Sequence, residues 1–375
     1  MAVLDADGHI HEPEAMYTAM EEEFYPRRPV MVALPSDTIV GDGELLWLIE
    51  GKAVPTTAGR GSTQFTLPGS RRSMTKRATV GNQTLEDVDA RLAGMDEIGI
   101  DTQAIFPTMF LINTIEDVGL EGGLCRAYNT YLSGAATRSR GRLKWNAILP
   151  WRDPEAAVRE LHRASDLGCS GIFTMGVIYE QQLNDPRFFP IYQAASDLDL
   201  PISIHLGWGS TQATQIFAEN SFFCSATIPV IWGFYFVMSS GLLGRFPRLR
   251  VGFIETGAQW VPYAINQVRR QYEPPAVKES GRRLEGGFQS ATNYYRDPLA
   301  WFEEGRAFVT FEEDEDLPHL LQHLGEDGLM MSTDYPHGDL SADHNFVAKL
   351  RRRDDIGDRV KQKLLGDNAA RFYRE

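Results

Sequence analysis

The feature that most constrains the fold is a regular alternation of short apolar runs and helix-like segments along the whole 375-residue chain. The runs have strand length and are continuously apolar, as is typical of strands buried on both faces of a parallel sheet. Eight such strand–helix units without a reversal favour an α/β fold of the closed (β/α)8, or TIM-barrel, type. The predicted strands are Val3–Asp7, Thr102–Phe106, Leu143–Leu149, Gly171–Met175, Pro201–Leu206, Arg250–Glu255, Ala307–Phe311 and Gly328–Thr333.

An open doubly wound sheet is the alternative fold, and it would require a glycine-rich phosphate-binding turn after the first strand. That position instead carries Asp-Gly-His-Ile-His at residues 7–11, so no dinucleotide site is expected. We therefore predict one barrel domain over residues 1–375. Its predicted helices include Leu85–Ile98, Pro154–Leu167, Pro186–Leu198 and Val261–Tyr272.

The connection after the first strand, from Glu12 to about Thr84, is too long for an ordinary βα loop. Turn signals surround a predicted hairpin made of Leu45–Ile49 and Lys52–Pro55. Long loops at the carboxyl ends of barrel strands form lids and substrate walls. We predict that residues 26–84 form an insertion or lid near the active-site mouth, with a decorative or oligomer-contacting insertion as the alternative.

The charge and cysteine content exclude several classes of protein. The net charge is −14, and no long basic stripe is present, which argues against nucleic-acid binding and against anchoring on anionic membranes. The three cysteines, Cys125, Cys169 and Cys224, are far apart and fit reduced thiols better than a disulfide framework. With no signal-peptide pattern at the N-terminus, we expect a cytoplasmic protein.

One uncharged segment, Asn220–Gly244, is long enough for a membrane span. It is interrupted by Pro229 and Gly233 and lies between two predicted barrel strands, so we favour a buried helix at a cavity wall or subunit interface. We expect no membrane association, a small-molecule substrate, and assembly as a homodimer or higher homo-oligomer.

Histidines and acidic residues gather at the ends of the predicted strands. The carboxyl ends of all barrel strands open onto the same catalytic face, so these side chains are expected to converge. They come from the first, fifth, sixth and eighth strands and from the loop that follows the eighth. They are Asp7, His9, His11, His205, Glu255, Asp334 and His337.

These residue types predict a metal centre. Alternate residues of a strand point the same way, so either Asp7 and His9 or His9 and His11 can bind one ion. Imidazole and carboxylate ligands suit zinc with one open position for water, and manganese is the alternative ion. A divalent cation lowers the pKa of bound water towards neutrality. We therefore predict a metal-dependent hydrolase acting on a C–N, C–O or C–C bond of a small carbonyl- or carboxylate-bearing substrate.

The order of these motifs resembles the amidohydrolase superfamily, and within it the amidohydrolase-2 branch of aminocarboxymuconate-semialdehyde decarboxylase-like TIM-barrel enzymes. Residues 4–9, Leu-Asp-Ala-Asp-Gly-His, match the opening motif Asp-x-[His/Glu/Asp]-x-His of that branch. His205 matches its strand-five ligand, and residues 332–336, Ser-Thr-Asp-Tyr-Pro, look like its strand-eight signature. The resemblance implies that Asp334 also acts as a base. The implied metal ligands are Asp7, His9, His205 and Asp334, with His11 in place of Asp7 as the alternative.

The chain departs from the branch at the end of the sixth strand, where decarboxylases carry a histidine and this sequence has Glu255. A carboxylate can act as a general base when burial tunes its pKa. We predict that Glu255 and His337 move protons beside Asp334. The alternatives are a helix cap or ion pair for Glu255 and simple loop packing for His337.

Two other functions remain open. Non-oxidative decarboxylation of an unsaturated or aromatic acid would use the same metal platform, and the Glu255 departure speaks against it. A non-catalytic binding barrel predicts the loss of one or more ligand positions, and the sequence retains all of them.

Overall fold

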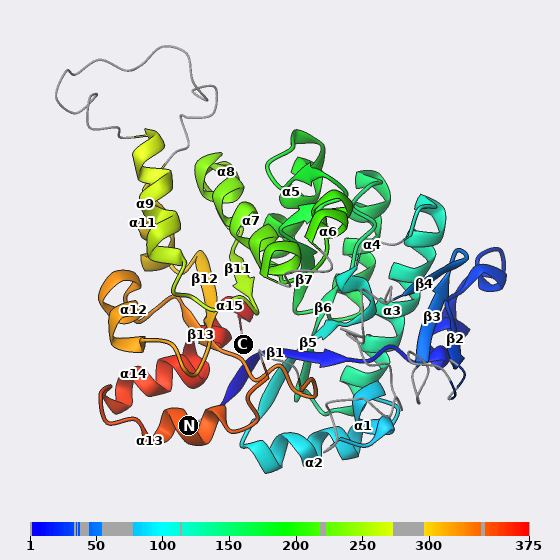
Figure 1. Cartoon of the computed structure of the whole chain (residues 1–375), viewed down its shortest axis with the longest axis horizontal. Helices are drawn as coiled ribbons and strands as arrows, with labels where there is room; N and C mark the ends of the chain where they lie inside the picture. Colours follow the sequence, from blue (N-terminus) through cyan, green and yellow to red (C-terminus); the bar gives the residue numbers. More distant parts are fainter. Residues whose placement is uncertain are drawn as a thin grey trace.

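A computed structural model describes residues 2–33, 35, 37, 45–54, 78–112, 115–217, 223–272, 296–338 and 342–374. Eight parallel strands form one sheet in the order β1-β5-β6-β7-β10-β11-β12-β13, surrounded by helices (Figure 1). The barrel strands are β1 (Leu4–Ile10), β5 (Thr102–Pro107), β6 (Leu143–Ala147), β7 (Gly171–Met175), β10 (Ile202–His205), β11 (Val251–Ile254), β12 (Ala307–Phe311) and β13 (Leu329–Met331).

The first and last strands meet and close the barrel. His9 N donates to Tyr335 O at 2.9 Å, Asp334 N donates to Asp7 O at 3.0 Å, and Gly8 forms a parallel bridge with Tyr335. The (β/α)8 prediction is therefore confirmed. This contact joins the two end strands of the sheet and brings the chain that follows β13 beside Asp7 and His9 of β1.

Several predicted strand boundaries differ from the observed ones, and two of these differences lie next to the site residues. The first strand was expected to end at Asp7, but β1 runs to Ile10 because it continues to pair with β5, His9 opposite Phe106 and Ile10 opposite Pro107. The eighth was expected to reach Thr333, but β13 ends at Met331. Beyond it, the Thr333 N–H donates to the Asp5 carboxylate at 2.9 Å.

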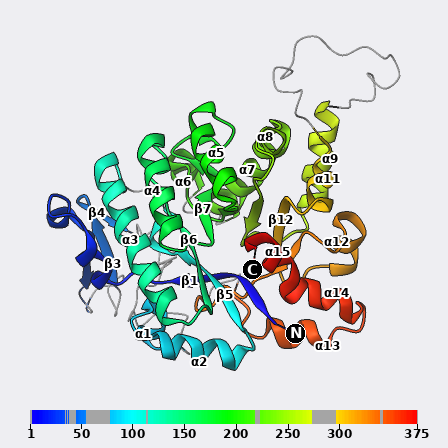
Figure 2. The same cartoon turned by 180° about the vertical axis from the view of Figure 1, so that it is seen from behind.

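Helices connect the barrel strands and cover their outer faces (Figures 1 and 2). Aspartate caps start several of them, as in α4, where the Asp153 carboxylate accepts the N–H of Ala156 and Pro154 occupies the first turn. The helices between barrel strands are α1 (Val80–Thr84), α2 (Val88–Ile98), α3 (Val118–Arg138), α4 (Pro154–Asp166), α5 (Phe189–Leu198), α6 (Thr211–Phe217), α7 (Ile228–Ser239), α8 (Leu242–Arg245), α9 (Val261–Tyr272), α11 (Pro298–Glu303) and α12 (Leu317–Leu324).

The remaining elements are short or follow the barrel. After β13 the chain forms α13 (Phe346–Arg352), α14 (Asp358–Gln362) and α15 (Asn368–Tyr373), with η7 (Lys363–Asp367) between the last two. The hairpin β8 (Val177–Ile178) and β9 (Gln181–Gln182) follows β7. Short helical segments in the described part of the chain are η1 (Glu14–Ala19), η2 (Tyr25–Arg27), η3 (Met109–Leu111), η4 (Pro186–Phe188) and η5 (Phe223–Thr227).

The described part of the predicted insertion contains a separate antiparallel sheet. It consists of β2 (Val30–Ala33), β3 (Leu45–Ile49) and β4 (Lys52–Val54) and lies beside α3 at the edge of the molecule (Figure 1). The β3–β4 hairpin agrees with the prediction, whereas β2 was not anticipated. Trp47 anchors the sheet by packing edge-on against Tyr17, with ring centroids 5.8 Å apart. Residues 55–77 of the insertion lie outside the described residues.

The uncharged segment around α7 packs against the barrel. Val230 and Phe234 are fully buried, and the Phe234 ring lies 5.0 Å from that of Phe253 in β11. None of the helices in the described part of the chain combines the length and apolar character that a membrane crossing requires.

Candidate metal centre and active site

Strand β1 contributes two side chains to the centre of the barrel. All seven residues of β1 are buried, and Asp7 Oδ1 lies 3.3 Å from His9 Nε2. The β1–β5 register shifts between Asp5 and Gly8, an irregularity that is common next to active sites. Glycine is required at position 8, because a Cβ there would lie 2.2 Å from the Gln103 side chain, which donates to the Asp5 carboxylate at 2.8 Å.

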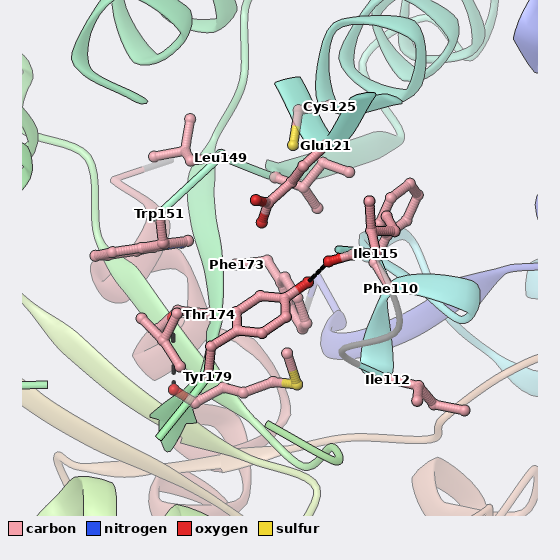
Figure 3. A pocket seen from close by; sticks show the side chains of 13 residues that line it. Phe110, Ile112, Ile115, Glu121, Cys125, Leu149, Trp151, Phe173, Thr174 and Tyr179 are labelled. Carbon is pink, nitrogen blue, oxygen red and sulfur yellow. Dashed lines mark hydrogen bonds between the residues drawn. The ribbon is translucent and has the colours of Figure 1, made fainter. Parts of the chain in front are cut away.

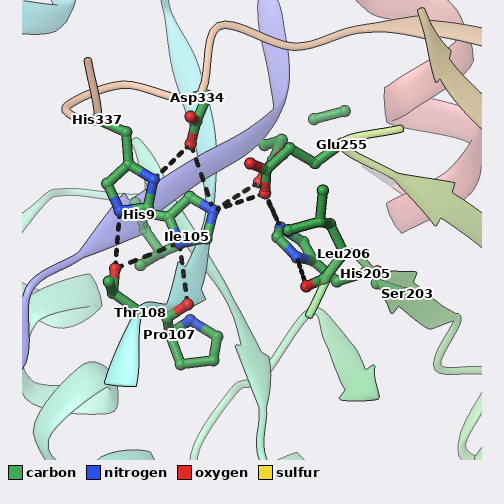
Figure 4. Close-up of polar contacts among 12 residues, drawn as sticks. His9, Ile105, Pro107, Thr108, Ser203, His205, Leu206, Glu255, Asp334 and His337 are labelled. Carbon is green, nitrogen blue, oxygen red and sulfur yellow. Dashed lines mark hydrogen bonds and ion pairs between the residues drawn. The ribbon is translucent and has the colours of Figure 1, made fainter. Parts of the chain in front are cut away.

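Two further side chains come from across the barrel. His205 ends β10, and its Nε2 lies 3.3 Å from Asp7 Oδ1. Glu255 follows β11, and its Oε2 lies 3.2 Å from His205 Nε2 and 3.7 Å from His9 Nε2 (Figure 4). Asp7, His9, His205 and Glu255 thus each offer a ligand atom within 4.8 Å of the others, and all four residues are buried.

Backbone carbonyls orient both imidazoles towards this cluster. His9 Nδ1 lies 2.9 Å from Pro107 O, and His205 Nδ1 lies 2.7 Å from Leu206 O (Figure 4). Because a carbonyl oxygen only accepts, each Nδ1 carries the proton and donates. In a neutral ring, each Nε2 then presents its lone pair to the carboxylates, which is the arrangement that metal-binding histidines use.

Asp334 and His337 lie on the other side of His9. Asp334 Oδ1 is 3.4 Å from His9 Nε2 and 2.9 Å from His337 Nδ1. The other ring nitrogen of His337, Nε2, lies 2.9 Å from Thr108 Oγ1, and the ring stacks on His9 with centroids 4.1 Å apart. His337 is therefore held between a carboxylate and a hydroxyl group (Figure 4).

His11, the alternative ligand, is buried but lies apart from the four-residue cluster. Its ring packs edge-on against His337 at 5.2 Å. Among the described residues, two groups could bind a metal ion. One contains Asp7 and His9, the other contains His9 and Asp334, and His11 belongs to neither. The fold thus brings together every other predicted site residue and leaves His11 behind His337.

The electrostatics of the cluster reflect burial and mutual contact. Burial alone would raise the pKa of Asp7, but His205 and His9 hold it well below its usual range. Burial alone would lower the pKa of His9, but Asp7 and Glu255 raise it to about 10. Burial, followed by the neighbouring His9 and His11, lowers the pKa of His337 well below its ordinary value. His337 is therefore a neutral imidazole at pH 7.

The donors present fit a divalent metal ion. Asp7 Oδ2 and His9 Nε2 are fully buried yet make no hydrogen bond of good geometry within the described residues. Leaving such atoms unsatisfied costs roughly 1–3 kcal/mol each. Two imidazole nitrogens surrounded by carboxylates form a donor set that a divalent cation satisfies.

Two of the site residues have an unusual backbone conformation. Glu255 and Asp334 have φ values of +61° and +55°, in the left-handed region that favours glycine. Holding a non-glycine residue there costs of order 1–3 kcal/mol, and such residues concentrate at functional sites. In both cases the conformation turns a carboxylate into the barrel directly after a strand.

The sequence did not point to Thr108 or Glu12. Thr108 directly follows β5 and contacts His337, and the buried Glu12 carboxylate accepts the N–H groups of Thr108 and Met109 at 2.9 Å each. A polar residue directly after an apolar strand was the available signal for Thr108. Glu12 offered no comparable signal, because its partners lie about 96 positions away.

Comparison with known proteins agrees with this site. A family model described as Amidohydrolase matches residues 6–374. The chain is 23% identical over 310 residues to gamma-resorcylate decarboxylase of a Polaromonas species, covering 78% of this chain and 89% of that protein. This family and relative indicate an enzyme, and the resemblance inferred from the motifs is confirmed.

Solved structures show the same fold. A crystal structure of an amidohydrolase from Mycobacterium avium subsp. paratuberculosis has a TM-score of 0.74 at 19% identity, covering 99% of this chain and 97% of that one. The 5-carboxyvanillate decarboxylase of Novosphingobium aromaticivorans, complexed with manganese and 4-hydroxy-3-methoxy-5-nitrobenzoic acid, has a TM-score of 0.68 at 19% identity, covering 82% and 85%.

Proposed function

The chain belongs to the amidohydrolase family, and from that premise we propose that it is a metal-dependent decarboxylase of an aromatic or unsaturated carboxylic acid. The hydrolase that the sequence favoured would use the same site. Decarboxylation is better supported, because the Polaromonas relative and the Novosphingobium structure are both named decarboxylases. The observation that carries the proposal is the buried cluster of two imidazoles and surrounding carboxylates at the barrel centre.

The metal ligands that we propose are Asp7, His9 and His205, completed by Asp334 or Glu255. The bound cation would attract the substrate carboxylate and stabilise the negative charge that develops as the carbon–carbon bond breaks. Zinc was expected from the sequence, whereas the solved decarboxylase named above contains manganese. The imidazole and carboxylate donors suit either ion, so metal analysis must decide between them.

The chemistry requires one proton. The carbon–carbon bond breaks, its electron pair stays with the substrate carbon, carbon dioxide leaves, and a proton bonds to that carbon. Glu255 and Asp334 lie on two sides of His9 and can deliver this proton from a protonated carboxyl group. His337 Nδ1 lies 2.9 Å from Asp334 Oδ1, and the other ring nitrogen, Nε2, lies 2.9 Å from the Thr108 hydroxyl oxygen. We therefore assign proton transfer to Glu255 and Asp334, supported by His337.

Apolar side chains limit water around the reacting groups. The Phe106 ring lies 4.8 Å from that of His205, and the Phe173 ring lies 5.9 Å from it. Both phenylalanines are buried. Low polarity next to the cluster strengthens its electrostatic interactions and favours a substrate with an apolar ring over a small hydrated one.

Metal analysis and a carbon dioxide assay test the proposal together. Purified protein should contain about one divalent ion per chain, lose activity with a chelator and recover it with zinc or manganese. 2,6-Dihydroxybenzoate and related acids should release carbon dioxide, and the amides of the same acids should not be hydrolysed. Hydrolysis of the amides without carbon dioxide release would favour the hydrolase, and full activity without metal would exclude both.

Self-association, a cytoplasmic location and a lid formed by residues 26–84 also belong to the proposal. Ile216 in α6 is 66% exposed and Tyr263 in α9 is 69% exposed, as an apolar contact between subunits would require. Light scattering on purified protein should give at least twice the mass of one chain. A monomer at micromolar concentration would contradict this part.

A further inference from the structure

A cavity lies beside the candidate site, at the carboxyl ends of β5, β6 and β7 (Figure 3). Its volume is about 50 Å³, and its walls include Phe110, Trp151, Phe173 and Tyr179. A water molecule needs about 10–15 Å³ by this measure, and a cavity of roughly 150 Å³ accepts benzene. The space therefore suits a substituent of a few atoms and excludes an aromatic ring.

Phe173 is shared between this cavity and the metal centre. Its ring lies 5.9 Å from that of His205, and its side chain also lines the cavity. Another lining residue, Ile112, pairs with Trp208, three residues after His205. The cavity and the metal centre therefore share Phe173 as a common wall.

The cavity contains one charged group, the carboxylate of Glu121 in α3. Glu121 is 8% exposed, and its Oε2 lies 2.8 Å from Arg152 Nη2. Within the described part of the chain, no hydrogen bond reaches the other oxygen, Oε1. Figure 3 shows the carboxylate directed into the space between Trp151 and Tyr179. Among the described residues, the wall thus presents a hydrogen-bond acceptor for which no protein donor is found.

Arg152 holds this acceptor in a fixed position. Its guanidinium lies 4.0 Å above the Tyr179 ring, and its Nη2 donates to Ile115 O at 2.7 Å. The Tyr179 hydroxyl donates to the same carbonyl at 3.0 Å, so it is not aimed at Glu121. The acceptor is therefore preorganised before any ligand binds.

We propose that this cavity is a substrate subsite for a short apolar arm that ends in a hydroxyl group, which donates to Glu121 Oε1. The aromatic walls select the apolar part of the arm, and the buried acceptor selects the hydroxyl, because an ether or methyl group there would leave it unpaired. The inference rests on the proposed function, since it takes the acid group of the substrate to bind at the metal centre.

Two pairs of probes test the subsite by calorimetry with metal-loaded protein. They are 3-(hydroxymethyl)benzoate against 3-methoxybenzoate, and the two 4-substituted isomers. The arms within each pair have the same number of heavy atoms, but only the hydroxymethyl arm donates. At one ring position the hydroxymethyl acid should bind about tenfold or more tightly, as for a hydrogen bond to a charged acceptor. Burial raises the pKa of Glu121 to about 7, so the titrations are done at pH 8.

Glu121→Gln should abolish this preference. The amide oxygen can replace Oε2 opposite Arg152, so the amide nitrogen faces the cavity and donates equally well to a hydroxyl or an ether oxygen. The matched control is Glu160→Gln in α4. Glu160 is 4% exposed and lies 2.8 Å from Arg163, but it does not line the cavity. This control should keep the wild-type preference.

Equal binding within both pairs by wild-type protein would overturn the inference, and that comparison needs no variant to fold. An unchanged preference in folded Glu121→Gln would overturn it as well. Carbon dioxide release tests the proposed function separately. If the protein prefers the hydroxymethyl acid but releases no carbon dioxide, only the decarboxylase proposal is refuted. If it releases carbon dioxide but binds both acids of each pair equally, only the subsite is refuted.

Discussion

Replacing Glu255 by glutamine separates its possible roles. The side chain is 3% exposed, and its Oε2 lies 3.2 Å from His205 Nε2 and 3.7 Å from His9 Nε2. Glutamine has the same size but cannot release or accept the proton. Positioned proton transfer contributes a rate factor of roughly 10²–10⁴. We therefore expect Glu255→Gln to remain folded and to lose turnover on that scale.

Metal affinity shows whether Glu255 is also a ligand. Changes to groups that support metal ligands typically lower affinity by roughly 10–100-fold. A loss within that range would leave Asp334 as the fourth ligand, as the family resemblance implies. A much larger loss would make Glu255 the fourth ligand, in keeping with its membership of the four-residue cluster. The metal affinities of the wild-type protein and of Glu255→Gln can be measured by competition with a chelating dye.

Glu312→Gln is the matched control, because Glu312 follows the neighbouring strand β12 and is partly buried. Burial, and then the negative charge of Glu255, raises the pKa of Glu312 to about 8. It is mostly neutral at pH 7, so the amide should change turnover by no more than a few-fold. If Glu255→Gln turned over at the wild-type rate and only its melting temperature fell, the catalytic assignment would be wrong.

Two further predictions concern the metal ligands. Asp7→Ala should lose most of its metal while His11→Ala keeps it, as measured by elemental analysis, and the opposite result would show that the His9 and His11 pairing is correct. Contact with Asp7 and Glu255 outweighs the effect of burial and raises the pKa of His9 to about 10 in the metal-free protein. His9 is therefore protonated at pH 7 and must release that proton when the metal ion binds. Affinity should therefore rise with pH, by up to tenfold per unit below pH 10. Calorimetry in two buffers of different ionisation enthalpy should detect about one released proton, and none would contradict the charge state assigned to His9.

Much of the fold could be predicted because the relevant signals are local. Buried parallel strands are continuous apolar runs, so β7 and β12 were predicted at their observed limits, Gly171–Met175 and Ala307–Phe311. Strand β1 was predicted too short because Asp7 and His9 are polar, and polar residues inside a strand resemble its end. Pairing with β5 and burial in a polar cluster keep them in the strand, and both causes are tertiary.

The sequence by itself determined the residue types of the site and the strands that carry them, since motif spacing and apolar runs are properties of neighbouring residues. Only the tertiary structure decided how those side chains pair. It brought Glu255 to His205, 50 positions away, and turned His337 between Asp334 and Thr108. It also left His11 out of the cluster and enclosed Glu121 in a cavity. These outcomes depend on barrel closure and on positive φ angles at Glu255 and Asp334, which bring together atoms that no local pattern relates.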